Sequence, residues 1–279
     1  MADRGRIALA LAVLVLLSLA GCRLFSRPFE RNPKLRLLRS ERGGEKVASS
    51  SLFHPVVSPD GEHVYYLSWG DSSGVWRTGF SDTSAVNVLP GFFLSMAMSP
   101  DGQLMVLVPE SHVIIGPLVT FDLGTAVAET IPYQIDAYDL EFSRTVARRF
   151  YYSSRETGLH WWDIDSSKDV LVDSTIRGHF DLTPSDSVVQ GLYKPRVHPG
   201  GRYVACVVSS RDGGIALFDL ATKDTVPLNA QPYKMGGVGS PYWTPDGKAL
   251  VFSAAESYLG DPGGTLPAEL WVLDSVFAK

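Results

Sequence analysis

The sequence predicts an all-β fold, a β-propeller of about five four-stranded blades. A turn-forming tetrapeptide recurs from residue 50 onward at the spacing of propeller blades. Each copy stands between short stretches rich in β-branched and aromatic residues, which are typical of strands. Beyond residue 21, no long segment shows the 3.6-residue periodicity of an amphipathic helix.

The N-terminal segment has the organisation of an export signal. Arg4 and Arg6 precede an uncharged apolar run over residues 7–20, which is shorter than the ~20 residues of a spanning helix. The run ends in Leu19-Ala20-Gly21-Cys22, which resembles the lipobox of bacterial lipoproteins. The resemblance implies cleavage between Gly21 and Cys22 and lipid on the Cys22 thiol. An ordinary signal peptide ending at a cysteine and a buried helix are the alternatives.

The lipobox resemblance also implies a location. Two or three acyl chains would hold the protein at a membrane, because one chain binds only marginally. In that family, Asp directly after the cysteine retains the protein at the inner membrane, and here the residue is Arg23. We therefore expect membrane lipid as one partner, and the outer membrane, facing the periplasm, if the host has two membranes.

The charge distribution divides the exported chain into a basic leader and an acidic body. Residues 22–46 carry a net charge of +5, and residues from 47 onward a net charge of −11. We expect a lipidated tether over residues 22–33 and a propeller over residues 34–279. The basic stretch suits anionic lipid head groups, or is a solvated linker. The acidic body argues against binding to nucleic acid.

The repeated tetrapeptide has the composition of a tight turn between antiparallel strands. Proline presets φ at the second position, aspartate tolerates the third, and glycine accepts the positive φ common at the last. Its second positions are 41, 44, 55 and 46 residues apart. The copies are Ser58-Pro59-Asp60-Gly61, Ser99-Pro100-Asp101-Gly102, a degraded Ser143-Arg144-Thr145-Val146, a loose His198-Pro199-Gly200-Gly201 and Thr244-Pro245-Asp246-Gly247.

Strands are predicted on both sides of every turn. Those before it are 53–57, 94–98, 138–142, 193–197 and 240–243; those after it are 63–67, 104–108, 149–152, 203–208 and 249–252; third strands follow at 74–77, 158–163, 214–219 and 269–274. The last blade lacks a fourth strand, so residues 34–50 are expected to close it, through 34–39 or 45–48. We interpret the 55-residue interval as holding a turn-rich insertion, Ser174 to Ser187. A truncated larger propeller is the competing blade count.

These repeats resemble the TolB-like propeller repeat, a relative of the WD-repeat family. The resemblance covers nearly everything from residue 50 to the end, with three good turns and two degraded ones. It implies a rigid ring with variable loops on two faces, of a kind used for partner binding in the cell envelope.

The sequence shows no arrangement typical of a catalytic, cofactor or metal site. Val238-Gly239-Ser240-Pro241-Tyr242 lacks both outer glycines of a nucleophile elbow, and Gly236–Gly239 lacks the lysine of a phosphate-binding loop. Cys206 lies in an apolar strand, where a buried thiol is expected. His160 and Trp161 of the 158–163 strand are kept as possible ligand contacts. His160 is a substituted position of the repeat, and of the adjacent Trp161 and Trp162 one is expected to be partly exposed, because adjacent strand residues face opposite sides.

We therefore expect a non-enzymatic, membrane-anchored module that binds a protein or peptide of the envelope. An alternative is a carbohydrate-binding or lyase-type propeller acting on an envelope or extracellular glycan, which requires convergent histidine, arginine or metal ligands at the channel mouth. A further alternative is a structural subunit of an envelope complex.

Overall fold

The structure, a computed structural model, describes residues 31–40, 51–70, 72–81, 84–110, 116–135 (backbone only at 132–135), 137–208, 214–233, 236–256 and 268–277. The chain divides into two units, residues 1–31 and 32–279, and the second is described here. The predicted cleavage site at Gly21 and Cys22 lies outside the described residues. Among those that are described, no helix is long and apolar enough to cross a membrane.

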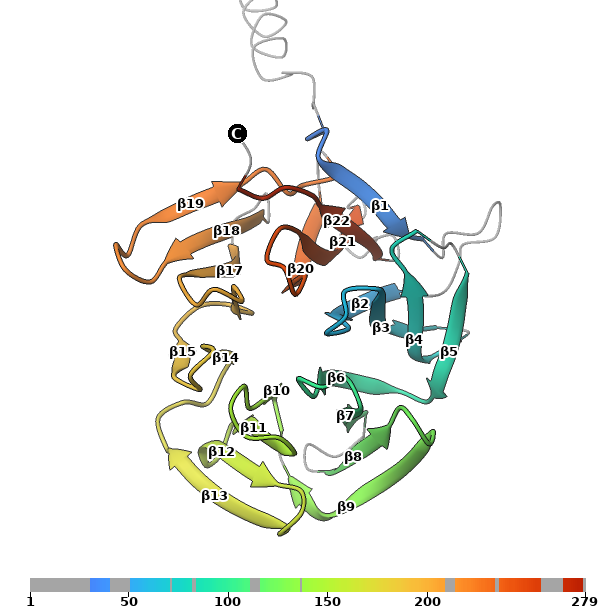
Figure 1. The fold of residues 1–279 in the computed structure, drawn as a ribbon, viewed down its shortest axis with the longest axis vertical. Helices are drawn as coiled ribbons and strands as arrows, with labels where there is room; N and C mark the ends of the chain where they lie inside the picture. Colours follow the sequence, from blue (N-terminus) through green and yellow to red (C-terminus); the bar gives the residue numbers. More distant parts are fainter. Residues whose placement is uncertain are drawn as a thin grey trace, which may run out of the picture. The chain divides into compact units, whose positions relative to one another are not determined.

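The described unit confirms the predicted all-β propeller with five four-stranded antiparallel blades, arranged as a ring (Figure 1). In chain order these blades are β2–β5 (Ser51–Val57, His63–Trp69, Gly74–Gly79, Ala85–Pro90), β6–β9 (Phe93–Met98, Leu104–Pro109, Gly116–Asp122, Val127–Ile135), β10–β13 (Asp139–Phe142, Arg149–Ser154, Gly158–Asp163, Lys168–Asp173), β16–β19 (Arg196–Val197, Tyr203–Val208, Gly214–Asp219, Thr225–Leu228) and β20–β22 (Gly236–Trp243, Leu250–Glu256, Glu269–Leu273) with β1 (Leu35–Arg39).

The last blade takes its outer strand from the start of the unit. Strand β1 pairs antiparallel with β22, and Leu35 lies opposite Leu273. Leu35, Trp271 and Leu273 share one buried cluster, so the pairing both covers a sheet edge and buries apolar surface. Of the two candidate closing segments, 34–39 contains β1, and 45–48 lies outside the described residues.

A two-stranded sheet occupies a place of its own in the ring. It comprises β14 (Phe180–Leu182) and β15 (Val188–Gln190). The innermost strands contact one another in the order β2, β6, β10, β14, β16, β20 and back to β2. The expected turn-rich insertion over 174–187 contains β14 and the turn after it, and with β15 it forms a blade reduced to its first hairpin. Buried Phe180 and Leu182 pack on Leu159 of the preceding blade.

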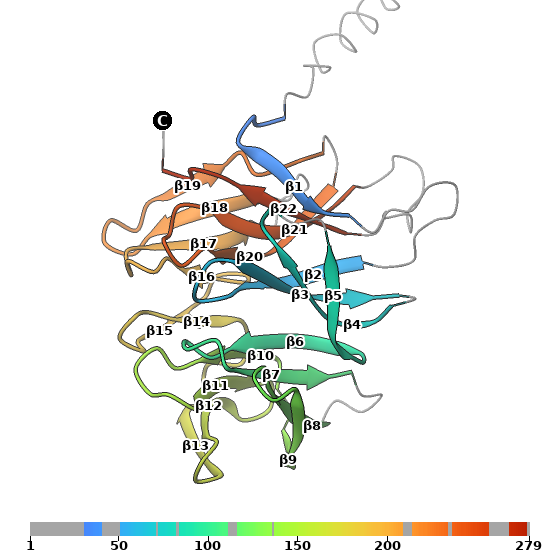
Figure 2. The ribbon, with the colours of Figure 1, turned by 45° about the vertical axis from the view of Figure 1, so that its right-hand side comes forward.

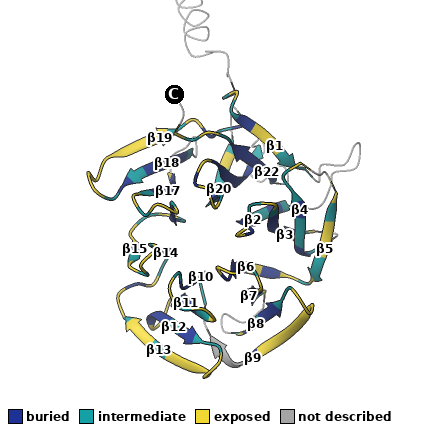
Figure 3. Ribbon diagram, in the orientation of Figure 1, coloured by how far each residue is buried: buried dark blue, intermediate teal, exposed yellow. Residues whose placement is uncertain are grey.

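The blades bury their inner strands and expose their outer ones. Strands β13 and β19 are largely exposed, whereas β7 and β21 are largely buried (Figure 3). A view turned by 45° shows the strands of neighbouring blades lying over one another (Figure 2). Apolar residues on both faces of the middle strands thus pack against the neighbouring blades, as the unbroken apolar runs predict.

Six turns, one per ring position, form what we call the turn collar: residues 58–61, 99–102, 143–146, 183–186, 198–201 and 244–247. In five of them the amide of the last residue donates to the carbonyl of the first, over 2.7–2.9 Å. The sixth copy, Thr183-Pro184-Ser185-Asp186, escaped detection in the sequence because Asp186 takes the positive φ, +59°, at the position where Gly61 and Gly102 stand.

Asp186 also supplies the carboxylate that the degraded turn at 143–146 lacks. In an intact turn, the aspartate accepts hydrogen bonds from the first hydroxyl and from a following amide, as Asp60 does from Ser58 and Glu62. The turn 143–146 has no aspartate. Instead, the Ser143 hydroxyl and the Arg144 amide both donate to the Asp186 carboxylate, each over 2.6 Å.

Neighbouring collar turns also pack against each other. The proline of one turn approaches the glycine of the next: a Cβ added to Gly102 would lie 2.9 Å from Pro59 Cδ, and one added to Gly201 would lie 3.2 Å from Pro184 Cδ. Gly247 is in the same position against the imidazole of His198. These glycines therefore serve close packing as well as positive φ.

We expect Gly247→Ala to destabilise the fold more than Gly61→Ala. Both positions have φ near +70°, which costs an alanine about 1–2 kcal/mol. At Gly61 the nearest atom to the new methyl is 3.8 Å away, whereas at Gly247 the methyl overlaps the His198 ring, raising the expected cost to about 2–4 kcal/mol. Denaturant unfolding measures the difference. In a His198→Ala background the excess should disappear; equal costs in the wild-type background would refute the packing account.

Candidate functional site

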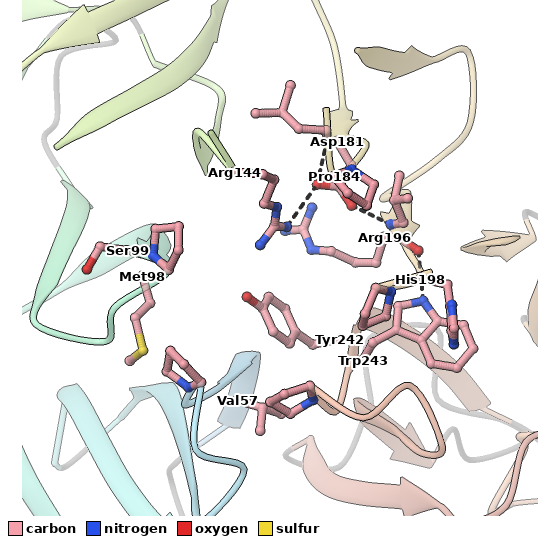
Figure 4. Close-up of a pocket in the computed structure, with 16 residues that line it drawn as sticks. Val57, Met98, Ser99, Arg144, Asp181, Pro184, Arg196, His198, Tyr242 and Trp243 are labelled. Atoms are coloured by element: carbon pink, nitrogen blue, oxygen red, sulfur yellow. Dashed lines mark hydrogen bonds and ion pairs between the residues drawn. The ribbon is translucent and has the colours of Figure 1, made fainter. Parts of the chain in front are cut away.

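A cavity of about 320 Å³ lies in the channel, at the end ringed by the collar (Figure 4). The second residue of every collar turn lines it. Five of these residues are prolines and the sixth is Arg144. Its full lining is Val57, Pro59, Met98, Ser99, Pro100, Arg144, Asp181, Leu182, Pro184, Arg196, Val197, His198, Pro199, Tyr242, Trp243 and Pro245. The degraded turn thus places a cation where every other turn has an apolar ring.

At the floor of this cavity lies what we call the charged layer, three charged side chains and one tyrosine from four successive innermost strands. Its members are Glu141 on β10, Asp181 on β14, Arg196 on β16 and Tyr242 on β20, each two residues before the first residue of its collar turn. Because strand side chains alternate with period two, a shared offset puts them at one depth in the channel. On β2 and β6 the same offset holds Val56 and Ala97, which are uncharged and buried in hydrophobic clusters.

Arg144 reaches down from the collar into this layer. Its guanidinium lies 2.7 Å from Glu141 and 3.7 Å from Asp181, and the second contact is visible in Figure 4. Arg196 lies 4.0 Å from the other oxygen of Glu141. Asp181, fully buried, also accepts the backbone amides of Leu182 and Val197. The network ties β10, β14 and β16 together across the reduced blade.

The groups of this layer shift one another's pKa values. Burial, reinforced by the nearby Asp181, raises the pKa of Glu141 to about 7, against the opposing pull of Arg144. Burial also raises the pKa of Asp181, and both arginines are held protonated by these acids. Burial followed by the charge of Glu141 raises the pKa of Tyr242 to about 12, so its hydroxyl remains a donor at neutral pH.

Glu141→Gln should flatten the pH dependence of folding stability. An acid whose pKa rises on folding binds its proton more tightly in the folded state, so its stabilising contribution is complete below the unfolded pKa. For Glu141 that contribution is lost as the pH rises from 4.5 to about 7. Glutamine does not titrate, so the unfolding free energy of the variant should fall less over this window. Parallel wild-type and variant curves in denaturant titrations would contradict the assignment.

The possible contacts expected on β12 do not belong to this cavity. His160 is buried, stacks on Tyr152, and shares hydrogen bonds with Thr157 and Asp169. Trp161 is partly exposed and has the guanidinium of Arg149 over its ring at 4.1 Å. Both lie on the third strand of their blade, away from the channel.

The predicted turn residues lie at the collar, and the charged layer below them was missed in the sequence. Four of the five turn copies predicted from the sequence place a proline in the cavity wall, namely Pro59, Pro100, Pro199 and Pro245. The missed signal was a charged or hydroxylated residue at a fixed offset before the turn, inside a strand otherwise buried. An alignment of the blades on their turns, with 183–186 included, would have brought these residues into one column.

Among the described residues, one group of three side chains has metal-ligand spacing. Asp60, on a collar turn, lies together with Glu62 and His63, which follow that turn, and the two acids are exposed. The Asp60 carboxylate already accepts two hydrogen bonds within its turn. We assign this group no ligand.

No family model matches the sequence, and no curated protein matches it. Solved structures do. The WD40 repeats of RRP9 superpose with a TM-score of 0.56 at 12% sequence identity, and the match covers 88% of this chain and 98% of that one. The structure of U3-55K gives a TM-score of 0.53 at 13% identity, and the match covers 88% of this chain and 100% of that one. Oligogalacturonate lyase from Vibrio parahaemolyticus gives 0.50 at 11%, covering 81% and 78%.

TolB structures are also among the matches. TolB from Acinetobacter baumannii gives a TM-score of 0.43 at 14% identity, and the match covers 80% of this chain and 54% of that one. This chain therefore spans about half the length of that TolB. At these identities the likeness to solved structures shows the propeller fold.

Proposed function

We propose that the propeller is a binding module of the cell envelope, and that the collar cavity receives a segment of a partner protein or peptide. The observation that carries the proposal is the cavity itself. All six ring positions contribute to its wall, and Asp181, Arg196 and Tyr242 of the charged layer line it. A concave, mostly apolar site with a few convergent polar groups is the usual form of a ligand site.

The lining indicates the chemistry of the bound segment. Five prolines, Met98, Leu182 and Trp243 offer an apolar wall, which suits an apolar side chain. Arg144 is 29% exposed, so part of its guanidinium faces the cavity while its acids hold it in place. A carbonyl or carboxylate beside that apolar side chain would meet a preorganised donor. The partner segment is therefore expected to combine an apolar anchor with an acceptor.

Site-specific photocrosslinking in intact cells tests the proposal. A benzoylphenylalanine at Pro100 places the probe in the cavity wall at an exposed turn position that no collar glycine packs against. The matched control is the same probe at Val226, 58% exposed on the outer strand β19. We expect a discrete protein adduct from position 100 and none of that mass from position 226. Identical adduct patterns, or no adduct from position 100, would overturn the assignment.

The lyase alternative makes a different prediction. A solved neighbour in the fold is an oligogalacturonate lyase, and the channel of this chain does hold arginines. Here, however, Arg144 and Arg196 are committed to Glu141 and Asp181. Incubation with oligogalacturonate should therefore give no unsaturated product by ultraviolet absorbance; formation of that product, lost in Arg196→Met, would replace the binding proposal.

The anchor is part of the proposal. Lipid on Cys22, with the basic residues of the tether over 22–33 lying on anionic head groups, would hold the ring close to an envelope membrane. A tethered ring meets partners of the same membrane at raised effective concentration. Its sites can therefore be of modest affinity and still be occupied.

A further inference from the structure

Three backbone irregularities recur at one position of successive blades. His54 on β2, Lys194 just before β16 and Ser240 on β20 have φ of +48°, +48° and +45°. Each precedes a proline, Pro55, Pro195 or Pro241. A residue before proline normally adopts an extended conformation, and positive φ is uncommon outside glycine.

These strained residues are not a requirement of the blade. Strand β10 builds the same innermost position with no positive φ. The two longer strands, β2 and β20, each carry an irregularity in register here, between Phe53 and Val56 and between Gly239 and Tyr242. Such bulges redirect side chains, and strained residues gather at functional sites.

The Lys194 and Ser240 side chains meet one layer further from the collar than Glu141 and Arg196, and His54 lies near enough to respond to the charges of Lys194 and Asp139. Lys194 and Ser240 stand two residues before Arg196 and Tyr242, and the Lys194 ammonium donates to the Ser240 hydroxyl over 3.1 Å. Asp139 and His179 complete the layer, joined by a hydrogen bond of 3.1 Å.

Two groups of this layer are left with unused binding capacity. Across the described residues, no carboxylate lies within ion-pair distance of the Lys194 ammonium, whose pKa is lowered by burial against the opposing charge of Asp139. The His54 ring has no hydrogen-bond partner within the same described set, and burial followed by the charge of Lys194 lowers its pKa to about 3. Its imidazole is therefore neutral and free to donate one N–H.

We infer that this layer is a second binding site, in which Lys194, Ser240 and His54 hold a carboxylate group. One ammonium, one hydroxyl and one neutral imidazole supply a single positive charge with two further donors. A carboxylate matches that charge. A doubly charged phosphate would face Asp139 with one lysine to balance it.

The test compares acetate with chloride and with acetamide, at constant ionic strength, on the purified full chain. A ligand of the folded state raises the thermal midpoint with concentration. We expect acetate to do so and the other two not. Lys194→Met should abolish the rise, and Lys223→Met, an exposed lysine on the turn between β18 and β19, should keep it. Acetate acting no better than chloride, or an unchanged rise in Lys194→Met, would overturn the inference.

Ser240→Gly guards against a misfolded lysine variant. Glycine adopts φ of +45° without strain, so the midpoint of the free protein should not fall. The acetate-induced rise should nevertheless shrink by half or more, because the hydroxyl donor is lost. An acetate response in Ser240→Gly equal to that of the wild type would show that the Ser240 hydroxyl does not bind the carboxylate, and would overturn the inferred site.

Two further arms identify the source of the carboxylate and separate this site from the collar. Tetra-alanine with a free C-terminus, acting at lower concentration than acetate and losing its effect when amidated, would assign a peptide terminus; acetate acting alone would assign a small acid. Pro100→Trp, in the collar, should leave the acetate response intact. Loss of the response in that variant would show that the two sites are one, and would overturn the inference of a second site.

Discussion

Arg144→Met is expected to lower the unfolding free energy by about 3–5 kcal/mol near pH 8, because it leaves two buried acids without their closest cation. Glu141 lies 2.7 Å from the guanidinium and Asp181 lies 3.7 Å from it. At low pH these acids accept protons instead, so the loss should shrink as the pH falls. Denaturant unfolding at several pH values measures both effects.

A double-mutant cycle separates the charge effect from lost packing. In a Glu141→Gln background, Arg144→Met leaves one unpaired acid in place of two, so its cost should fall by more than 1 kcal/mol. Arg144→Lys should lower the unfolding free energy by less than Arg144→Met does. The loss should still be measurable, because an ammonium lacks the planar fork that reaches both acids. Additive costs in the cycle would mean that the ion pairs do not stabilise the ring.

Cys22→Ala is expected to abolish membrane retention. The proposed lipid attachment requires this thiol, so a precursor with an intact signal should accumulate. Fractionation of cells, followed by mass analysis of the chain, reads out both.

Cys206→Ala is the matched control. That thiol is buried on β17 and donates to the Ala216 carbonyl over 3.7 Å, so its replacement should change stability slightly and leave retention unaltered. A Cys22→Ala protein that is processed and fractionates like the wild type would refute the lipobox interpretation.

The blade pattern could be predicted because each turn encodes its own geometry. Proline and glycine at fixed positions specify the turn locally, and apolar runs beside it specify buried strands. The turn Thr183-Pro184-Ser185-Asp186 departs from this pattern, because Asp186 stands where four of the other turns have glycine. Its carboxylate accepts hydrogen bonds from the turn at 143–146. A residue chosen for a neighbour's hydrogen bonds gives no local signal, and the reduced blade was therefore read as an insertion.

The candidate site was less predictable for a related reason. Glu141, Asp181 and Arg196 are separated by 40 and 15 residues in sequence and meet because the ring closes. Each taken singly is an isolated charge in a short strand. Whether these three side chains lie together depends on the register of three blades, one of them reduced. Their ion pairs also require Arg144, which replaces the proline of its turn. Likewise, the strain at His54, Lys194 and Ser240 is visible only in the backbone.

The most direct test of the central claim is the dissociation constant of the partner captured from position 100, measured against purified wild-type protein and two tryptophan variants. Pro100→Trp fills the collar cavity, and Val226→Trp adds the same ring to the exposed outer strand β19. We predict binding at least ~10-fold weaker, equal to about 1.4 kcal/mol, for Pro100→Trp and unchanged binding for Val226→Trp. Equal affinities for all three proteins would show that the partner binds elsewhere on the propeller.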